Sequence, residues 1–261
     1  MYQAMHTFRQ KLDSGHLCLG SGITLSDIAV TEALGPSVDF FWIDTEHSPI
    51  GYEALAGHLV AARSTGTPAL VRTPSSDNAL VKRALDVGAP GVIAPQIESA
   101  EEARQFVRQC RYPPEGLRGF GPRRPSNYGR EGGREFLDKA NSGVFVVAQI
   151  ERLRAVQELD EILEIPGLDS IVVGPNDLAH EMGYAGDESN IEVRKTIEDV
   201  VARGRQAGLY VGMGMGEDPE QILWAADIGT QWIQPGGDFS YMVAGCDRLF
   251  ADVRRQLAAR K

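Results

Sequence analysis

The sequence predicts a single-domain α/β fold of the (β/α)8 TIM-barrel type over residues 1–261. Three observations favour it: eight short apolar runs rich in β-branched residues, a helical stretch between most of them, and a length typical of one barrel. Continuous apolar strands suit a parallel sheet that is covered on both faces. A doubly wound open sheet is the alternative, because the number of strands does not establish closure. The expected strands are residues 17–23, 38–45, 68–73, 91–97, 144–150, 168–174, 209–214 and 232–235.

Helix signals lie between these runs. Asp77 is placed as an N-cap, and Ser99 followed by Glu102 has the spacing of a capping box. Glycines close several of the segments, as expected for helix C-termini. We expect helices at residues 51–64, 77–87, 99–110 and 191–206.

One interval, residues 111–141, lacks a strand pattern and is rich in Arg, Pro and Gly. A long irregular insertion in a compact barrel is often functional or an oligomer contact. A tolerated surface loop is the alternative.

Composition limits the function. The formal net charge of −10 argues against a nucleic-acid partner. Three cysteines without CxxC spacing favour free thiols in a reducing compartment. The N-terminus lacks a signal-peptide pattern, and no apolar run is long enough to span a membrane, so a cytoplasmic protein is expected.

Polar residues follow directly after the apolar strands. They stand where a barrel places its reactive groups, at the C-terminal ends of the strands. Buried in a core they would be costly, so they are expected to line a mouth. The residues are Asp44, Thr45, Glu46 and His47 after the second strand, Arg72 after the third, Gln96 after the fourth, Gln149 and Glu151 at the fifth, and Gly174–Asp177 after the sixth.

Glu151 and Asp177 follow adjacent strands, so their carboxylates can meet at the rim. Two close carboxylates repel unless they share a proton or a cation. Hard oxygen ligands select Mg2+ or Mn2+, and such a cation would polarise a 2-oxo acid and stabilise its enolate. The alternative is a strand-end charge for Glu151 and a helix N-cap for Asp177.

His47, Asp86 and Arg72 are the candidate catalytic groups. An imidazole at a strand end can act as a base near neutral pH, with Asp86 as a partner that raises its basicity. Arg72 can place a fixed positive charge beside an enolate oxygen. The alternatives are a hydrogen-bonded rim histidine and a structural salt bridge.

Glycines 212, 214 and 216 form a GxGxG pattern late in the chain, which is not the spacing of a dinucleotide-binding loop. Loops after the last two strands of a barrel often bind phosphate. Together with Gly236 and Gly237 they could serve a phosphorylated ligand.

Several segments resemble the HpcH/HpaI aldolase family of class II pyruvate-dependent aldolases, over nearly the whole chain. They are DTEHSPIGYEAL at 44–55, RALDVGAPGVIAPQIESAEEA at 83–103, RYPPEGLRG at 111–119, VAQIER at 147–152 and GLDSIVVGPNDLAHEMGYAGD at 167–187.

The resemblance implies roles for single residues. His47 would be the base with Asp86 paired to it, Arg72 would stabilise the enolate, and Glu151 and Asp177 would bind Mg2+, Mn2+ or Co2+. The 2-oxo acid would contact Gln149, Gly174, Pro175, Asn176 and Asp177. A homohexamer built as a trimer of dimers is implied, with residues 239–257 as an exchanged last helix and the insertion reaching an adjacent site.

The expected reaction is the reversible cleavage of a 4-hydroxy-2-oxo acid to pyruvate and an aldehyde. The chain departs from the better-known family members at Asn176, where Ala is common, and in the sequences GMGMGE and QPGGDFS at its last two strand ends. The identity of the aldehyde is therefore not implied by the resemblance. One alternative is a 2-oxo-acid (oxaloacetate) decarboxylase or a synthase on the same site. Another is a non-catalytic barrel that binds a phosphorylated ligand. No lysine stands at a strand end, which disfavours Schiff-base chemistry.

Overall fold

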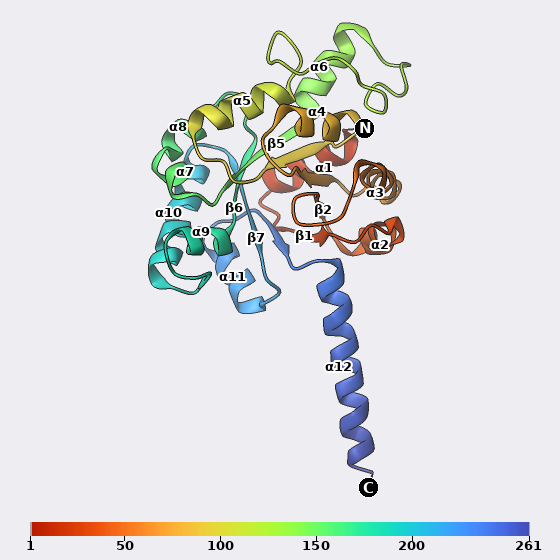
Figure 1. The fold of residues 1–261 in the computed structure, drawn as a ribbon, viewed down its shortest axis with the longest axis vertical. Coiled ribbons are helices and arrows are strands. Elements are labelled where there is room, and N and C mark those ends of the chain that lie inside the picture. Colours follow the sequence, from red (N-terminus) through yellow and green to blue (C-terminus); the bar gives the residue numbers. More distant parts are fainter. Residues whose placement is uncertain (1, 261) are drawn as a thin grey trace.

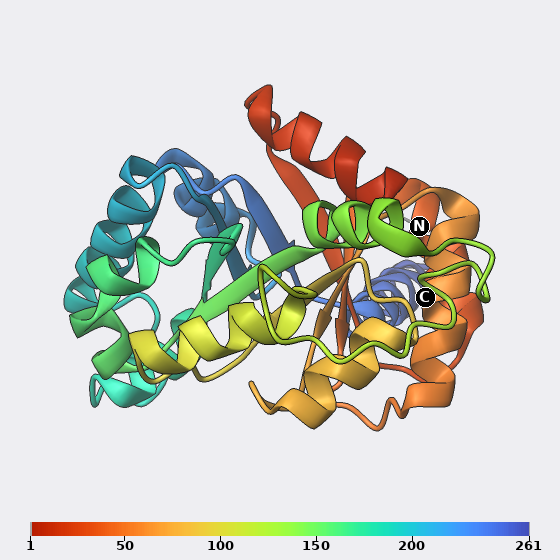
Figure 2. The same cartoon turned by 90° about the horizontal axis from the view of Figure 1, so that it is seen from above.

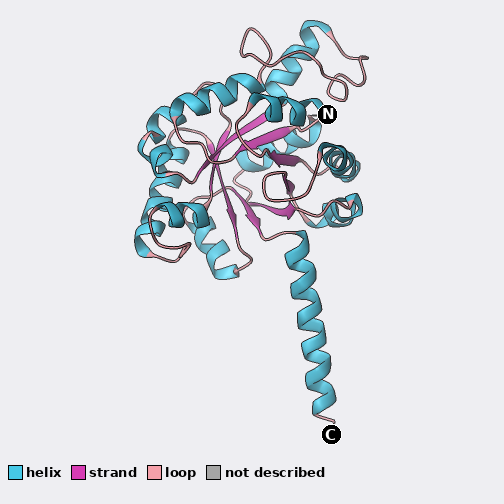
Figure 3. Cartoon of the chain, viewed as in Figure 1, coloured by secondary structure: helices cyan, strands magenta, loops and turns pink. Residues whose placement is uncertain are grey.

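The computed structural model describes residues 2–260, which form a closed barrel of eight parallel strands (Figures 1 and 3). The first strand pairs with both the second and the eighth, so the barrel is confirmed and the open-sheet alternative is wrong. Every expected strand is present. The strands are β1 (Cys18–Ile23), β2 (Phe40–Asp44), β3 (Ala69–Arg72), β4 (Gly91–Ala94), β5 (Phe145–Ile150), β6 (Ser170–Val173), β7 (Tyr210–Met215) and β8 (Trp232–Pro235).

Aromatic side chains fill the barrel interior. Phe40 and Trp232 meet edge to face, with ring centroids 5.5 Å apart. Glycines on neighbouring strands make the room, since a Cβ at Gly20 would lie 2.4 Å from the Phe40 ring and one at Gly212 would lie 2.1 Å from the Trp232 ring. Alternation of large and small side chains is how a small barrel reaches close packing.

Helix α1 (Gln3–Asp13), which the sequence pattern did not predict, closes the N-terminal end of the barrel. It buries Met5, Phe8 and Leu12 in the interior cluster. The Phe8 ring lies 5.4 Å from that of Phe40, the first residue of β2. Its apolar residues recur at spacings of three and four, and that signal could have identified the helix.

The predicted helices are confirmed to within one residue. They are α3 (Tyr52–Thr65), α4 (Asn78–Asp86), α5 (Ala100–Cys110) and α10 (Ile191–Gln206). Asp77 and Ser99 both cap as expected, but the Glu102 carboxylate accepts from Glu98 N, so the predicted reciprocal bond to Ser99 N is wrong. The shorter elements are α2 (Ile28–Leu34), η1 (Gly35–Ser37), α7 (Leu153–Gln157), α8 (Leu159–Leu163), α9 (Pro175–Glu181) and α11 (Pro219–Asp227).

The interval 111–141 is irregular only as far as Gly132, because α6 (Gly133–Gly143) occupies its end. The Phe136 ring lies 6.0 Å from that of Tyr112 and 6.3 Å from that of Phe120. This aromatic cluster stabilises α6, a helix that the Arg- and Gly-rich composition of the interval does not predict.

The last helix, α12 (Asp238–Ala258), projects away from the barrel (Figure 1) and is seen almost along its axis in Figure 2. Its first residue, Asp238, is buried and accepts hydrogen bonds from Thr24 N and Leu25 N, which tie the helix to the end of β1. Within residues 2–260, neither this helix nor any other is long and apolar enough to cross a membrane.

Candidate active site

Two hollows open at the C-terminal ends of the strands, where the sequence places its polar residues. The first hollow, of about 210 Å3, is lined by Gln96, Glu151, Arg152, Asp177, His180 and Glu181. The second hollow, of about 310 Å3, lies on the side of β1, β7 and β8. Arg72 and Asp44 line the second hollow. Gln96 donates hydrogen bonds both to Glu151 at the first hollow and to Glu46, which lies 3.2 Å from Arg72 at the second, so the two hollows belong to one mouth.

Glu151 is buried at the end of β5, with 2% of its surface exposed. Its Oε1 accepts from Gln96 N at 2.7 Å, and its Oε2 accepts from Gln149 Nε2 at 2.5 Å. Burial, followed by the negative charge of Asp177, raises the pKa of Glu151 although both hydrogen bonds oppose the rise. Burial disfavours the charged form of this carboxylate, and a bound cation would offset that penalty.

The neighbouring strand makes room for this carboxylate with a glycine. A Cβ at Gly174 would lie 2.4 Å from Glu151 Oε2 and 3.0 Å from Gln149 Nε2. Gly174 also precedes α9 as its N-cap, and Asp177 stands in the first turn of that helix. The alternative that Asp177 is itself an N-cap is therefore wrong.

The donors around the first hollow fit a hard cation. Glu151 and Asp177 supply carboxylate oxygens, and the buried Gln149 Oε1 has no hydrogen-bond partner among the described residues. Hard divalent cations take oxygen ligands of this kind. Gln149 is thus near the carboxylate pair, as the sequence predicts.

Arg72 is held by the carboxylate of Asp44, a residue for which the sequence predicts no specific role. Its Nε and Nη2 donate to Asp44 Oδ1 and Oδ2 at 3.0 and 2.7 Å, and its Nε lies 3.2 Å from Glu46 Oε2. Burial disfavours the charged forms of Asp44 and Arg72, but the salt bridge between them lowers the pKa of Asp44 and raises the pKa of Arg72. Arg72 is therefore a salt-bridged residue, as the structural alternative proposed, and its bonds to Asp44 are made by Nε and Nη2.

His47 is exposed beside this pair, with Nε2 3.5 Å from Glu46 Oε2. Asp86 is not near it within one chain. It ends α4, at the N-terminal side of the strands, and its Oδ1 accepts from Arg118 at 3.1 Å. The carboxylate that faces His47 is Glu46, whose pKa is raised by burial in spite of Arg72 and His47.

Gln96 forms hydrogen bonds with both Glu151 and Glu46 and so connects these two acidic residues. Its backbone N–H donates to Glu151, its Nε2 donates to Glu46 Oε1 at 3.0 Å, and its Oε1 accepts from Arg152 at 2.8 Å. The residue has a φ of +51°, in the left-handed region that few residues other than glycine adopt. Only this conformation, which the sequence does not reveal, turns its N–H toward Glu151.

Several N–H groups of the glycine loops are used inside the fold and so are unavailable to a phosphate. Gly22 N donates to Gly236 O at 3.1 Å, Gly236 N to Met215 O at 2.9 Å, and Gly237 N to Ser240 Oγ at 3.0 Å. Among the described residues that line the second hollow, only Arg72 is cationic, and it is paired with Asp44. The expectation of a phosphate site at these loops is not supported.

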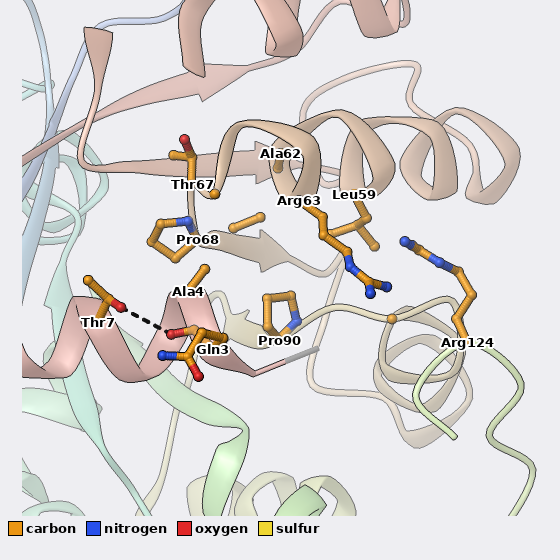
Figure 4. A pocket seen from close by; sticks show the side chains of 13 residues that line it. Gln3, Ala4, Thr7, Leu59, Ala62, Arg63, Thr67, Pro68, Pro90 and Arg124 are labelled. Atoms are coloured by element: carbon orange, nitrogen blue, oxygen red, sulfur yellow. Dashed lines mark hydrogen bonds between the residues drawn. The ribbon is translucent and has the colours of Figure 1, made fainter. Parts of the chain in front are cut away.

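The opposite end of the barrel carries a different set of groups. A hollow of about 350 Å3 there is lined by Gln3, Thr7, Arg63 and Arg124 among others (Figure 4). His16, Cys18 and Asp39 also lie close together at that end, but Lys11 Nζ contacts Asp39 at 2.5 Å. Neither place holds the predicted site residues.

Comparison with known proteins agrees with the chemistry of the mouth. A family model described as HpcH/HpaI aldolase/citrate lyase matches residues 25–239. The chain is 37% identical to a hydroxypyruvate/pyruvate aldolase of Roseovarius nubinhibens over 89% of this chain and 91% of the relative. It is 32% identical to a 4-hydroxy-2-oxo-heptane-1,7-dioate aldolase of Shigella flexneri over 94% of this chain and 92% of the relative.

A solved structure of an HpcH/HpaI aldolase/citrate lyase family protein from Burkholderia cenocepacia superimposes with a TM-score of 0.89. It is 33% identical and covers 95% of this chain and 99% of its own. Fold, sequence and site therefore agree, and the chain belongs to the HpcH/HpaI aldolase/citrate lyase family.

Proposed function

We propose that the protein is a divalent-metal-dependent aldolase that reversibly cleaves a 4-hydroxy-2-oxo acid to pyruvate and an aldehyde. The observation that carries this proposal is the meeting of Glu151 and Asp177 at one hollow, with Arg72 beside it. The printed names of the relatives, aldolases of 2-oxo acids, support the same reaction.

Glu151 and Asp177 would hold the cation, which is Mg2+, Mn2+ or Co2+. When bound, it supplies Lewis-acid stabilisation of negative charge on the keto oxygen of the 2-oxo acid. The substrate lies against Gln149 and the Gly174–Asp177 segment. Asn176 and Asp177 lie in the first turn of α9. Their backbone N–H groups have no acceptor within the helix and could donate to the substrate.

His47 and Arg72 have different roles in cleavage, His47 as the base and Arg72 as the group that stabilises the enolate. The exposed His47 imidazole takes the proton of the 4-hydroxyl, with Glu46 as its charged neighbour. The C3–C4 bond breaks, its electron pair forms the pyruvate enolate, and the aldehyde leaves. Arg72 Nη1 stabilises the enolate oxygen until C3 is protonated.

Metal removal and one ligand variant test this function. EDTA should abolish pyruvate release from 4-hydroxy-2-oxo acids, and Mn2+ should restore it. Asp177→Asn should require a much higher Mn2+ concentration for half-maximal activity, whereas Asp187→Asn, an exposed Asp in a nearby loop, should not. Pyruvate release that is unchanged by EDTA would refute the proposal.

We also propose that the protein is a homo-oligomer, a hexamer built as a trimer of dimers, in which α12 is exchanged between neighbours. Only Asp238 of α12 is buried, and its large apolar side chains recur at helical spacing and are exposed in one chain. Such a stripe needs a cover. Light scattering should give six copies, and Leu249→Glu with Val253→Glu should give a smaller species. The stripe is Phe239, Met242, Val243, Leu249, Phe250, Val253 and Leu257.

The predicted pairing of Asp86 with His47 depends on that assembly. Asp86 is at the far end of α4 in its own chain, next to the insertion residue Arg118. We propose that Asp86 reaches His47 from a neighbouring copy. If so, mixing inactive His47→Ala and Asp86→Ala proteins during refolding should restore part of the activity.

We propose a cytoplasmic location. Cys18, Cys110 and Cys246 are all free, as expected in a reducing compartment. Cell fractionation with an epitope-tagged chain is the measurement.

A further inference from the structure

The residues that line the second hollow indicate which kind of aldehyde this chain accepts. Membership of the family does not determine that aldehyde. Four of the twelve residues that line the hollow are glycines, and Trp42, Gln234 and Glu217 are among the side chains that remain. The inference below rests on the proposed aldolase function, because it takes this hollow as the place of the aldehyde.

The position of the hollow relative to Arg72 supports that assignment. A 2-oxo acid held at Glu151 and Asp177 with its keto oxygen toward Arg72 would place its C3 atom beside the second hollow, which Arg72 lines. The carbon that bonds to C3 would then approach from the side of β1, β7 and β8.

The charges at this hollow are unfavourable for a second anion. Arg72 is already paired with Asp44 through a bidentate bond, and Glu46 is a further carboxylate beside it, so two carboxylates accompany the one cation. Glu217 adds a negative charge in the loop between β7 and α11, and a Cβ at Gly236 would lie 2.5 Å from its Cγ. Its field reaches Tyr241, whose pKa is raised by burial and then by the charges of Glu217 and Asp238.

Apart from Arg72, several donor groups of the hollow are already bonded within the fold. The donors of Gly22, Gly236 and Gly237 are used inside the fold. Thr24 Oγ1 donates to Asp238, and Gln234 Nε2 donates to Gly236 O. The Glu217 carboxylate and Gln234 Oε1 remain, and acceptors of this kind pair with the hydroxyl groups of a ligand.

We propose that the second hollow selects a short, uncharged hydroxyaldehyde as the partner of pyruvate, that Glu217 is a specificity-determining residue, and that aldehydes bearing a carboxylate or phosphate are disfavoured. Glu217 accepts a hydroxyl hydrogen bond from the neutral aldehyde and repels an anionic one. Trp42, whose ring lies under the Arg72 guanidinium with its centroid 5.3 Å from Cζ, forms part of the wall of the hollow.

Matched pairs of aldehydes test this in the direction of addition to pyruvate with Mg2+. The pairs are 3-hydroxypropanal with malonic semialdehyde, and D-glyceraldehyde with its 3-phosphate. We expect kcat/KM to favour the neutral member of each pair by about tenfold or more at low ionic strength, and the preference to shrink in about 0.5 M salt because an exposed charge is screened. Glu217→Gln should narrow the preference, and Glu217→Lys should abolish or invert it. Glu220→Gln, an equal change of charge in the first turn of α11, should leave it unchanged.

Two outcomes would overturn the inference: an anionic aldehyde that reacts as well as its neutral partner, or a preference that Glu217→Lys does not move. Exchange of the pyruvate methyl protons in D2O with Mg2+, measured by NMR without any aldehyde, separates these from a failure of the proposed function. If the pyruvate methyl protons exchange but neutral aldehydes are not preferred, only the assignment of the aldehyde is refuted. No exchange refutes the aldolase itself.

Discussion

Gly174→Ala gives a direct test of the first hollow, because it adds one methyl group against the carboxylate that is to bind the metal. The new Cβ would lie 2.4 Å from Glu151 Oε2 and 3.0 Å from Gln149 Nε2. Non-bonded atoms need about 3.4 Å or more, so the carboxylate must retreat by about 1 Å. The backbone at Gly174 has φ −103° and ψ 89°, which alanine can adopt, so the effect is steric and not conformational.

A displacement of this size is large for a metal ligand. Ligand distances are held within about 0.2 Å, and Glu151 cannot move without disturbing its bonds to Gln96 N and Gln149 Nε2. Loss of such supporting contacts weakens metal binding by about 10–100-fold. That range corresponds to about 1.4–2.7 kcal/mol of binding free energy.

The assay is Mn2+ titration by calorimetry, with circular dichroism to show that the variant is folded. Gly216→Ala is the matched control, because a Cβ at Gly216 meets nothing within 4 Å at the same mouth. If Gly174→Ala binds Mn2+ with the dissociation constant of the parent protein, Glu151 Oε2 does not contact the ion and the assignment of this ligand fails.

Three other substitutions probe the neighbouring groups. Arg72→Lys keeps the charge but loses the bidentate geometry, so kcat should fall by about 10²–10³-fold, and a fall below threefold in steady-state kinetics would contradict its role. Asp44→Asn should lower the free energy of unfolding at pH 7 by about 1.5–3 kcal/mol. Because the folded pKa of Asp44 is lowered, its stabilisation is present above the unfolded pKa of about 3.9 and is lost as pH falls, so urea titrations of parent and variant should converge toward acidic pH. Gly212→Ala would place a Cβ 2.1 Å from the Trp232 ring and should cost about 1–3 kcal/mol by overpacking; an unchanged melting temperature would show that the ring has room to move.

The strand pattern was sufficient to predict the eight strands, since each of the eight apolar runs became a barrel strand. Closure was not visible in it, because the hydrogen bonds between β1 and β8 join residues about two hundred positions apart. Helices with capping residues were predictable, whereas α6 depends on an aromatic contact between Phe136 and Tyr112 that has no local signature.

The sequence by itself determined which strand ends carry charged and polar groups, because apolar runs followed by charged residues mark the mouth of a barrel, and it predicted Glu151, Asp177, His47 and Arg72 as site residues. Only the tertiary structure decided their partners. It assigned Asp44 to Arg72 and Glu46 to His47, and it placed Asp86 at the opposite end of α4. A side chain's partner depends on distances across several strands and on the direction of each helix, and neither is encoded in the spacing of residues along the chain.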